Sequence, residues 1–148
     1  MYNKILLPTD GSKQAVKAGE YALSTADFTG AEIIVLYVID TYYLDALPQP
    51  DLREQLDKEL SDEGKKVVED FRQKLEDTQC AGKCTNVTLV TMIKEGKPAD
   101  VILKTIEEED VDAVVIGRTG KHGLEKFLLG STAEKVVRHA KVPVNVIS

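Results

Sequence analysis

Two glycine-containing segments near the end of the chain have the composition needed to hold a phosphate group. Residues 117–123 read GRTGKHG, and Gly130-Ser131-Thr132 opens a stretch whose apolar spacing is typical of a helix. Because glycine has no Cβ, a phosphate can approach its backbone closely, and a positive φ can turn successive N–H groups inward. A helix that begins after Gly130 would add free N–H groups, a favourable dipole and two hydroxyl groups. The same glycines could form ordinary turns with Ser131 as an N-cap, so these residues alone leave both interpretations open.

The spacing of this segment differs from that of two common nucleotide-binding motifs. Gly120-Lys121 is followed by His122 rather than by the Ser or Thr of a Walker A loop, and a G-x-G-x-x-G fingerprint would follow the first strand. Lys121 and His122 could reach a phosphate group from the loop. No carboxylate is spaced to orient His122, however, so the sequence assigns no catalytic base.

A second group of polar side chains follows the first apolar segment. Pro8-Thr9-Asp10-Gly11-Ser12 places one carboxylate and two hydroxyl groups where a strand is expected to end. Asp10 could hold a metal ion, order a loop, or accept a hydrogen bond from a ribose. The alternative is that Asp10 only forms an Asx-type turn into the following helix.

Two cysteines, Cys80 and Cys84, lie in the sequence CAGKC. This C-x3-C spacing has neither a second cysteine pair nor a nearby histidine, and so it is poor evidence for a metal site. We expect two plain thiols in a connecting loop.

Five short apolar segments alternate with helical patterns, and this alternation predicts a parallel sheet that is covered on both faces. Two of the segments, Ile33–Leu36 and Ala113–Ile116, are continuously apolar, and we expect them to lie in central strands. The predicted strands are Lys4–Thr9, Glu32–Ile39, Asn86–Ile93, Ala113–Gly117 and Pro143–Ile147.

Caps and periodicity predict four helices between these strands. The first is capped by Ser12, presents a ridge of alanines (Ala15, Ala18, Ala22 and Ala26) to the sheet and ends at Gly30. The second is a long amphipathic helix from about Leu52 to Leu75 that Gly64 weakens, and the stretch before it, residues 40–51, is expected to be a loop. The third begins at Pro98 and buries Val101, Ile102 and Ile106, and the fourth follows Ser131 with Ala133, Val136, Val137 and Ala140 on one face.

Composition limits the class of protein. A chain of 148 residues with 43% hydrophobic and 30% charged residues fits a single folded domain over residues 1–148, without a long apolar span for a membrane. The N-terminus MYNKILLPTDG lacks the hydrophobic region of a signal peptide, so we expect a cytoplasmic protein. A net charge of −6 without a basic stripe argues against nucleic acid as a partner. Any phosphate must therefore be held locally, by backbone N–H groups.

The chain resembles the universal stress protein family, in which ATP-binding members carry G-x2-G-x9-G-[ST] after the fourth strand. Gly117, Gly120, Gly130 and Ser131 fit this pattern in full. The likeness covers essentially the whole chain, including PTDGS at residues 8–12, Gly96-x-Pro98 and the VPV sequence that starts the last strand. It implies a Rossmann-like α/β fold: a doubly wound, open, parallel five-stranded sheet with helices on both faces and strand order 3-2-1-4-5.

The resemblance also implies roles for particular residues. Asp10 would lie near the ribose and phosphates with a metal ion, and the main chain at Val38 would recognise adenine. Phosphates would follow Gly117, Gly120 and Gly123 towards Gly130, with Mg²⁺ or Mn²⁺ sharing their charge. The expected nucleotide-binding residues are Pro8, Thr9, Asp10, Val38, Gly117, Arg118, Gly120, His122, Gly123, Gly130, Ser131 and Thr132.

The sequence is compatible with three functions. The first is an ATP-binding regulatory or stress-response protein, a switch or sensor with at most slow hydrolysis, and we favour it because only part of a phosphoryl-transfer site is visible. The second is a true ATPase or nucleotide-hydrolysing enzyme, and the third is a dimerisation module that binds no nucleotide. The resemblance implies a homodimer through the C-terminal strand, although Asn145 departs from the usual apolar run there. A protein partner is expected but not identified.

Overall fold

Five parallel strands form the centre of the protein, and five helices are described around them. The computed structural model describes residues 2–120 and 129–148. The strands are β1 (Lys4–Pro8), β2 (Glu32–Asp40), β3 (Thr88–Gly96), β4 (Ala113–Gly117) and β5 (Val144–Ile147). The helices are α1 (Lys13–Thr29), α2 (Thr41–Asp45), α3 (Pro50–Cys80), α4 (Pro98–Glu108) and α5 (Ser131–His139).

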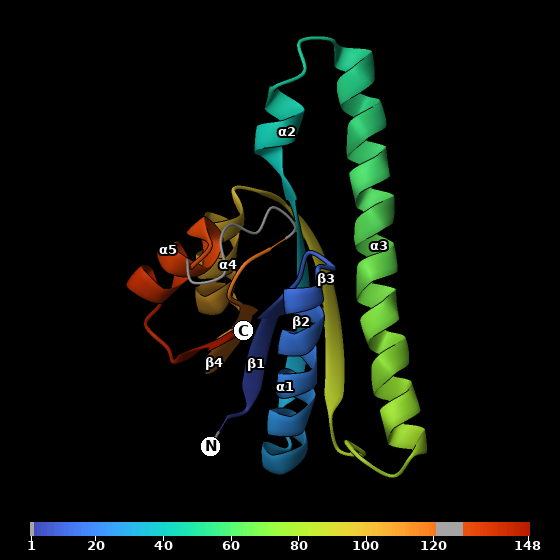
Figure 1. Cartoon of the computed structure of the whole chain (residues 1–148), viewed down its shortest axis with the longest axis vertical. Helices are drawn as coiled ribbons and strands as arrows, with labels where there is room; N and C mark the ends of the chain where they lie inside the picture. Colours follow the sequence, from blue (N-terminus) through green and yellow to red (C-terminus); the bar gives the residue numbers. More distant parts are fainter. Residues whose placement is uncertain (1, 121–128) are drawn as a thin grey trace.

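The sheet has the strand order β3-β2-β1-β4-β5, and every strand pair is parallel. Alternate side chains point to opposite faces, so that Ile5 and Leu7 belong to one hydrophobic core and Leu6 to the other. Helices α1 and α3 cover the first core and helices α4 and α5 the second (Figure 1). The expected doubly wound α/β fold and its strand order are confirmed.

Helix α1 packs closely on the sheet because its inner ridge is made of alanines. The Ser12 hydroxyl accepts a hydrogen bond from the Ala15 N–H group at 3.2 Å, and Gly30 ends the helix with a φ of 72°. The four ridge alanines are 6% exposed or less. The predicted caps and buried face of this helix are confirmed.

Gly64 does not interrupt α3, which runs through it for 31 residues. A Cβ at this position would lie 2.6 Å from Cδ1 of Tyr37, so the glycine makes room for the tyrosine ring. The Tyr37 hydroxyl lies 3.3 Å from Oε2 of Glu63, and burial together with the nearby carboxylates of Glu63 and Asp10 raises the pKa of Tyr37 to about 12. The glycine therefore serves packing between α3 and β2.

Three details differ from the sequence-based expectation. The stretch expected to be a loop, residues 40–51, contains α2, because the Asp40 carboxylate accepts a hydrogen bond from the Tyr42 N–H group at 2.9 Å and caps a short helix. Strand β3 begins two residues later and continues to Gly96, through polar residues that the apolar pattern did not include. Val137 is 44% exposed, since α5 buries only Ala133 and Val136 fully.

Both cysteines are free thiols. Cys80 is the last residue of α3 and is exposed, whereas Cys84 lies in the following turn and is buried. Burial, with the Asp27 carboxylate nearby, raises the pKa of the Cys84 thiol. The raised pKa of Cys84 is the opposite of the lowered pKa that activates a thiol for chemistry.

None of the helices within the described residues has both the length and the apolar composition that crossing a membrane requires.

Replacing Gly64 by alanine tests the packing role of this glycine. In an exposed helix Gly→Ala stabilises by about 1 kcal/mol, whereas overpacking a core costs about 1–3 kcal/mol. With Tyr37 Cδ1 2.6 Å from the new methyl group, we expect the clash to win and the free energy of unfolding to fall by about 1–2 kcal/mol in urea titrations. In a Tyr37→Leu background the same change should stabilise. A stabilising effect in both backgrounds would contradict this explanation.

Candidate functional site

The sheet has its topological switch point between β1 and β4. The chain leaves β1 through α1 towards β2, and it leaves β4 through α5 towards β5, so the two connections diverge on opposite faces. Such divergence opens a crevice outside the carboxyl ends of the strands, where ligands of doubly wound folds bind. The residues that end β1, β2 and β4 therefore form the candidate site.

The turn from β1 to α1 fixes the Asp10 carboxylate at this edge. Pro8 is buried as the last residue of β1, and the Thr9 N–H group donates to the Leu36 carbonyl at 2.9 Å. Oδ1 of Asp10 accepts from the Ser12 N–H group at 2.9 Å, and the Thr9 hydroxyl accepts from the Gly11 N–H group at 3.2 Å. The Asx turn, which the sequence offered as an alternative to a binding role for Asp10, is thus present. The turn holds Oδ1, and Oδ2 lies beside Gly120.

The glycines after β4 do two different things. A Cβ on Gly117 would lie 3.0–3.1 Å from the backbone of Gln14, so Gly117 lets α1 approach β4 closely. A Cβ on Gly120 would overlap Oδ2 of Asp10, so Gly120 lets the carboxylate approach the segment after β4. Of these two glycines, Gly120 brings expected site residues together, whereas Gly117 acts mainly in packing.

Gly130 joins the start of α5 to the end of β4. Its N–H group donates to the Arg118 carbonyl at 2.8 Å, and the Arg118 N–H group donates to the Ile147 carbonyl at 2.8 Å. Gly130 is itself the N-cap of α5, so Ser131 is the first helical residue and not the cap. Gly130 has no side chain that could accept a hydrogen bond from the first turn of α5, so no side chain caps the N–H groups of that turn. An anion site at a helix N-terminus requires uncapped N–H groups of this kind.

The main chain of Val38 points past the end of β1. The Leu36 carbonyl faces β1, because it accepts from Thr9, and in a strand the backbone groups of residues two apart face the same side. The N–H and C=O groups of Val38 therefore project into the space that β1 vacates after Pro8. A donor and an acceptor side by side can pair with the edge of a planar heterocycle such as adenine.

Gly117, Gly120 and Gly130 do not adopt positive φ angles. Among the described glycines, those with positive φ are Gly11, Gly30, Gly82 and Gly96. The inward-turned nest expected at Gly117, Gly120 and Gly130 is therefore wrong for these three residues, which act through the missing Cβ alone. His122 and Gly123 lie outside the described residues.

Gln14 is a residue of this region that the sequence did not single out. It follows Lys13 in the first turn of α1, against Gly117, and its Oε1 is the buried side-chain polar atom that lacks a hydrogen-bond partner among the described residues. No motif marks it, because its importance comes only from the close approach of α1 to β4.

The described residues contain no group of three or more His, Cys, Asp or Glu side chains that could hold a metal ion. Asp10 is the carboxylate expected to take part. One carboxylate suits an ion such as Mg²⁺ that receives its remaining ligands from phosphates and water.

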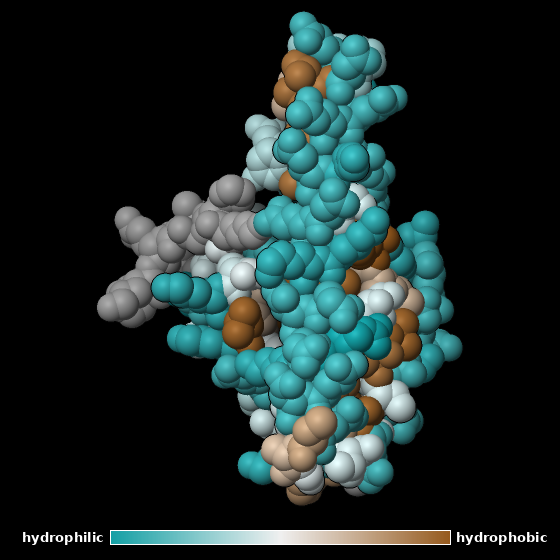
Figure 2. All heavy atoms as spheres, turned by 90° about the vertical axis from the view of Figure 1, so that its right-hand side faces the viewer, coloured by the Kyte–Doolittle hydropathy of each residue, from teal (hydrophilic) through white to brown (hydrophobic). Residues whose placement is uncertain are grey.

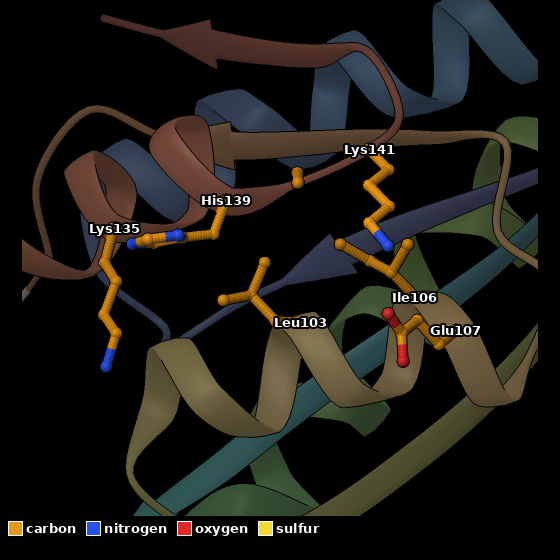
Figure 3. Close-up of a pocket in the computed structure, with 7 residues that line it drawn as sticks. Leu103, Ile106, Glu107, Lys135, His139 and Lys141 are labelled. Atoms are coloured by element: carbon orange, nitrogen blue, oxygen red, sulfur yellow. The ribbon is translucent and has the colours of Figure 1, made fainter.

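Another hollow lies between α4 and α5, with a volume of about 370 Å³ (Figure 3). Leu103 and Ile106 of α4 and Ala140 line it with Glu107, Lys135, His139 and Lys141. It reaches the C-terminal ends of both helices, where the helix dipoles oppose the binding of an anion. We therefore place the candidate site at the strand ends and not in this hollow.

Comparison with known proteins gives consistent matches over the whole chain. Residues 1–148 match the model of the universal stress protein family. A universal stress protein from Methanothermobacter thermautotrophicus is 38% identical over 147 residues, which are 99% of this chain and 96% of the relative. Protein MJ0577 of Methanocaldococcus jannaschii has a solved structure with a TM-score of 0.84 and 32% identity, over 99% of this chain and 96% of that chain.

A more distant match is a universal stress protein family protein from Arabidopsis thaliana that was solved with AMP bound. Its TM-score is 0.66 at 21% identity, over 98% of this chain and 90% of that chain. At this identity the likeness concerns the fold.

The two glycines after β4 should respond differently to alanine. Gly117→Ala places a methyl group against the backbone of α1, which cannot move without disturbing the core, and we expect it to lower the free energy of unfolding by about 2 kcal/mol. Gly120 is exposed, and among the described residues its new methyl group would meet only the Asp10 carboxylate, so Gly120→Ala should change stability by less than about 0.5 kcal/mol. Chemical denaturation of both variants measures the difference. Equal losses would show that Gly117 has no special packing role.

Proposed function

This chain belongs to the universal stress protein family, and from that premise we propose that it binds an adenine nucleotide, ATP in particular, at the carboxyl ends of β1, β2 and β4. We further propose that it acts as a nucleotide-dependent switch or sensor in a stress response, with at most slow hydrolysis. The observation that carries the proposal is the N-terminus of α5, capped by a glycine and lying at the same sheet edge as Asp10 and Val38.

The proposed pose follows from the chemistry of each group. Adenine pairs with the backbone N–H and C=O groups of Val38. The ribose and first phosphates lie near Asp10, with Pro8 and Thr9 shaping the turn beneath them. The last two phosphates lie over Gly130, Ser131 and Thr132, where free N–H groups and the positive end of the α5 dipole favour an anion.

The remaining expected residues complete this proposal. Arg118 and Gly120 flank the phosphate path, and Gly117 sets the position of α1 beside it. Gly123 is proposed to line the same path, and His122 is proposed to take part in nucleotide binding. Asp10 together with the phosphates would hold Mg²⁺ or Mn²⁺, whose charge would offset the repulsion between a triphosphate and a chain with a net charge of −6.

A binding role is favoured over catalysis by the groups at the site. Phosphoryl transfer needs an oriented nucleophile and a residue that positions it. Oδ1 of Asp10 already accepts the turn hydrogen bond from the Ser12 N–H group, so it is not available to position a nucleophile. The true ATPase remains the second candidate function, and a phosphate-release assay with Mg²⁺ distinguishes it: turnover faster than nucleotide dissociation would favour the enzyme.

We also propose a cytoplasmic homodimer that pairs through β5. This strand lies at the edge of the sheet, its four residues are half-buried, and Asn145 donates a hydrogen bond to the Val114 carbonyl at 3.4 Å. The Ile147 carbonyl at the end of β5 accepts a hydrogen bond from the Arg118 N–H group. This bond connects the strand proposed to form the dimer to a residue proposed to flank the phosphates. Occupancy of the site could thus bias self-association, and a partner protein would read the result. A dimer that binds no nucleotide is the third alternative.

Charge at the first residue of α5 provides a sharp test of the phosphate position. Ser131→Glu adds an anion to the first turn, which stabilises the helix but repels a bound phosphate. We expect the affinity for ATP, measured by calorimetry, to fall at least about tenfold, while thermal stability is unchanged or higher. Ser131→Gln, of similar size and no charge, is the control and should lose much less. Equal affinities of the two variants would refute the assignment.

The role of Asp10 with the metal ion can be separated from its role in the turn. Asparagine retains an Oδ1 that accepts from the Ser12 N–H group, so Asp10→Asn keeps the Asx turn and removes only the charge. We expect ATP affinity in Mg²⁺ to fall about tenfold and affinity in EDTA to stay the same or rise, because a nearby negative charge is lost. A similar loss under both conditions would remove Asp10 from the metal site.

A further inference from the structure

Helix α2 and the first part of α3 project beyond the carboxyl end of the sheet (Figure 1). We call residues 40–62 the acidic arm. Residues 50–55 are all exposed, and the first fully buried residue of α3 is Gly64, which lies just beyond the arm. The arm therefore contributes less to the core than the rest of α3.

The arm carries nearly all the net charge of the chain. It has seven carboxylates against two cationic side chains, Arg53 and Lys58, and so a formal charge of −5 out of the −6 of the whole chain. The seven are Asp40, Asp45, Asp51, Glu54, Asp57, Glu59 and Asp62. The remaining 125 residues are close to neutral, so the acidic character of the protein is local.

Exposed apolar side chains accompany this charge. Tyr42 is 72% exposed and Leu52 46% exposed, and Tyr43 contacts Tyr42 edge to face with ring centroids 5.5 Å apart. Figure 2 views the molecule from the side of α3 and shows apolar atoms near the tip of the arm within a largely hydrophilic surface. Aromatic side chains in such positions are typical of binding surfaces.

A hollow of about 480 Å³ lies at the base of the arm, between α3 and the ends of β2 and β3. Ile39 and Ile93 supply apolar surface, and Glu54, Asp57, Asp62 and Glu95 supply carboxylates, with Lys58, Ser61 and Lys65 completing the lining. Asp57 and Glu95 face each other: a hydrogen bond between them, burial and the charge of Asp57 raise the pKa of Glu95. A cationic group placed here would relieve this crowding of like charges.

We propose that the acidic arm docks a cationic, amphipathic segment of a partner protein. Lysine or arginine side chains of that segment lie against the arm carboxylates, and its apolar side chains pack on Tyr42, Tyr43 and Leu52 or enter the hollow. The charge of the arm disfavours nucleic acid and a second copy of the arm, since both would bring further negative charge. The proposal does not depend on nucleotide binding, because none of its groups is placed in the nucleotide site.

The test uses the full chain and a fluorescent helical peptide built only of leucine and lysine, with its leucines on one face. We expect fluorescence anisotropy to show binding of this peptide and none of a peptide with glutamate in place of lysine. Glu54→Gln/Asp57→Asn/Asp62→Asn should weaken binding about tenfold. The matched control removes three carboxylates at the end of α4, Glu107→Gln/Glu109→Gln/Asp110→Asn, and should change affinity less than about twofold.

The apolar contribution has its own matched pair. Tyr42→Ser should weaken binding severalfold, whereas Phe28→Ser, at a residue of α1 that is 86% exposed and outside the arm, should have no effect. Both changes are on the surface, so folding is expected to persist and is checked by circular dichroism.

Three results would overturn the proposal. The first is an absence of peptide binding. The second is an equal loss of peptide affinity in the two triple variants, which would indicate diffuse electrostatic attraction. The third is full competition by spermine together with no effect of Tyr42→Ser, which would indicate a site for small cations only.

Discussion

The burial of β1 on both faces is the constraint on which the rest of the structure depends. Ile5, Leu6 and Leu7 are at most 1% exposed, so each face of the strand must be covered by helices. With β2 on one side of β1 and β4 on the other, the chain meets this requirement by sending α1 and α5 in opposite directions. This divergence creates the switch point at the carboxyl end of the sheet, where the residues of the candidate site gather. The packing that buries β1 therefore also positions the candidate site.

The glycines show how closely stability and site geometry are joined. Gly64 and Gly117 face a tyrosine ring and a helix backbone, and both serve the approach of one element to another. Gly120 and Gly130 instead shape the segment that is proposed to hold phosphates, one beside Asp10 and the other bonded to Arg118. A motif that reads as a row of equivalent glycines thus contains residues with separate physical roles.

The fold was largely predictable because it rests on local patterns that agree with one another. The apolar runs at Ile33–Leu36 and Ala113–Ile116 can only be buried on two sides. Ser12 and Gly30 mark the ends of α1 by residue type alone, because serine supplies a capping hydroxyl and glycine adopts a positive φ. Helix α2 was missed because five residues are too few for a periodic pattern and its stability comes from a single cap at Asp40. The end of β3 was missed because Lys94 and Glu95 are polar at a sheet edge.

The candidate site was predictable in position but not in detail. The strand ends followed from the alternation of elements, and the spacing of Gly117, Gly120 and Gly130 was visible in the sequence. The contact of Asp10 with Gly120 and the N-cap role of Gly130 depend on tertiary geometry, and so does the buried amide oxygen of Gln14. The carboxylates of the acidic arm are visible in the sequence, but only the structure shows that the arm projects beyond the sheet.

We propose that the carboxyl edge of the sheet holds the base and phosphates of an adenine nucleotide. Titration of isotope-labelled protein with ATP and Mg²⁺, followed by the backbone amide resonances, measures where the nucleotide binds. We expect the largest shifts at the N–H groups of Val38, Ser131 and Thr132, with little change at His139 and Lys141 beside the α4–α5 hollow. Shifts centred on that hollow, or unchanged resonances at Val38 and Ser131 under saturating ATP, would contradict it.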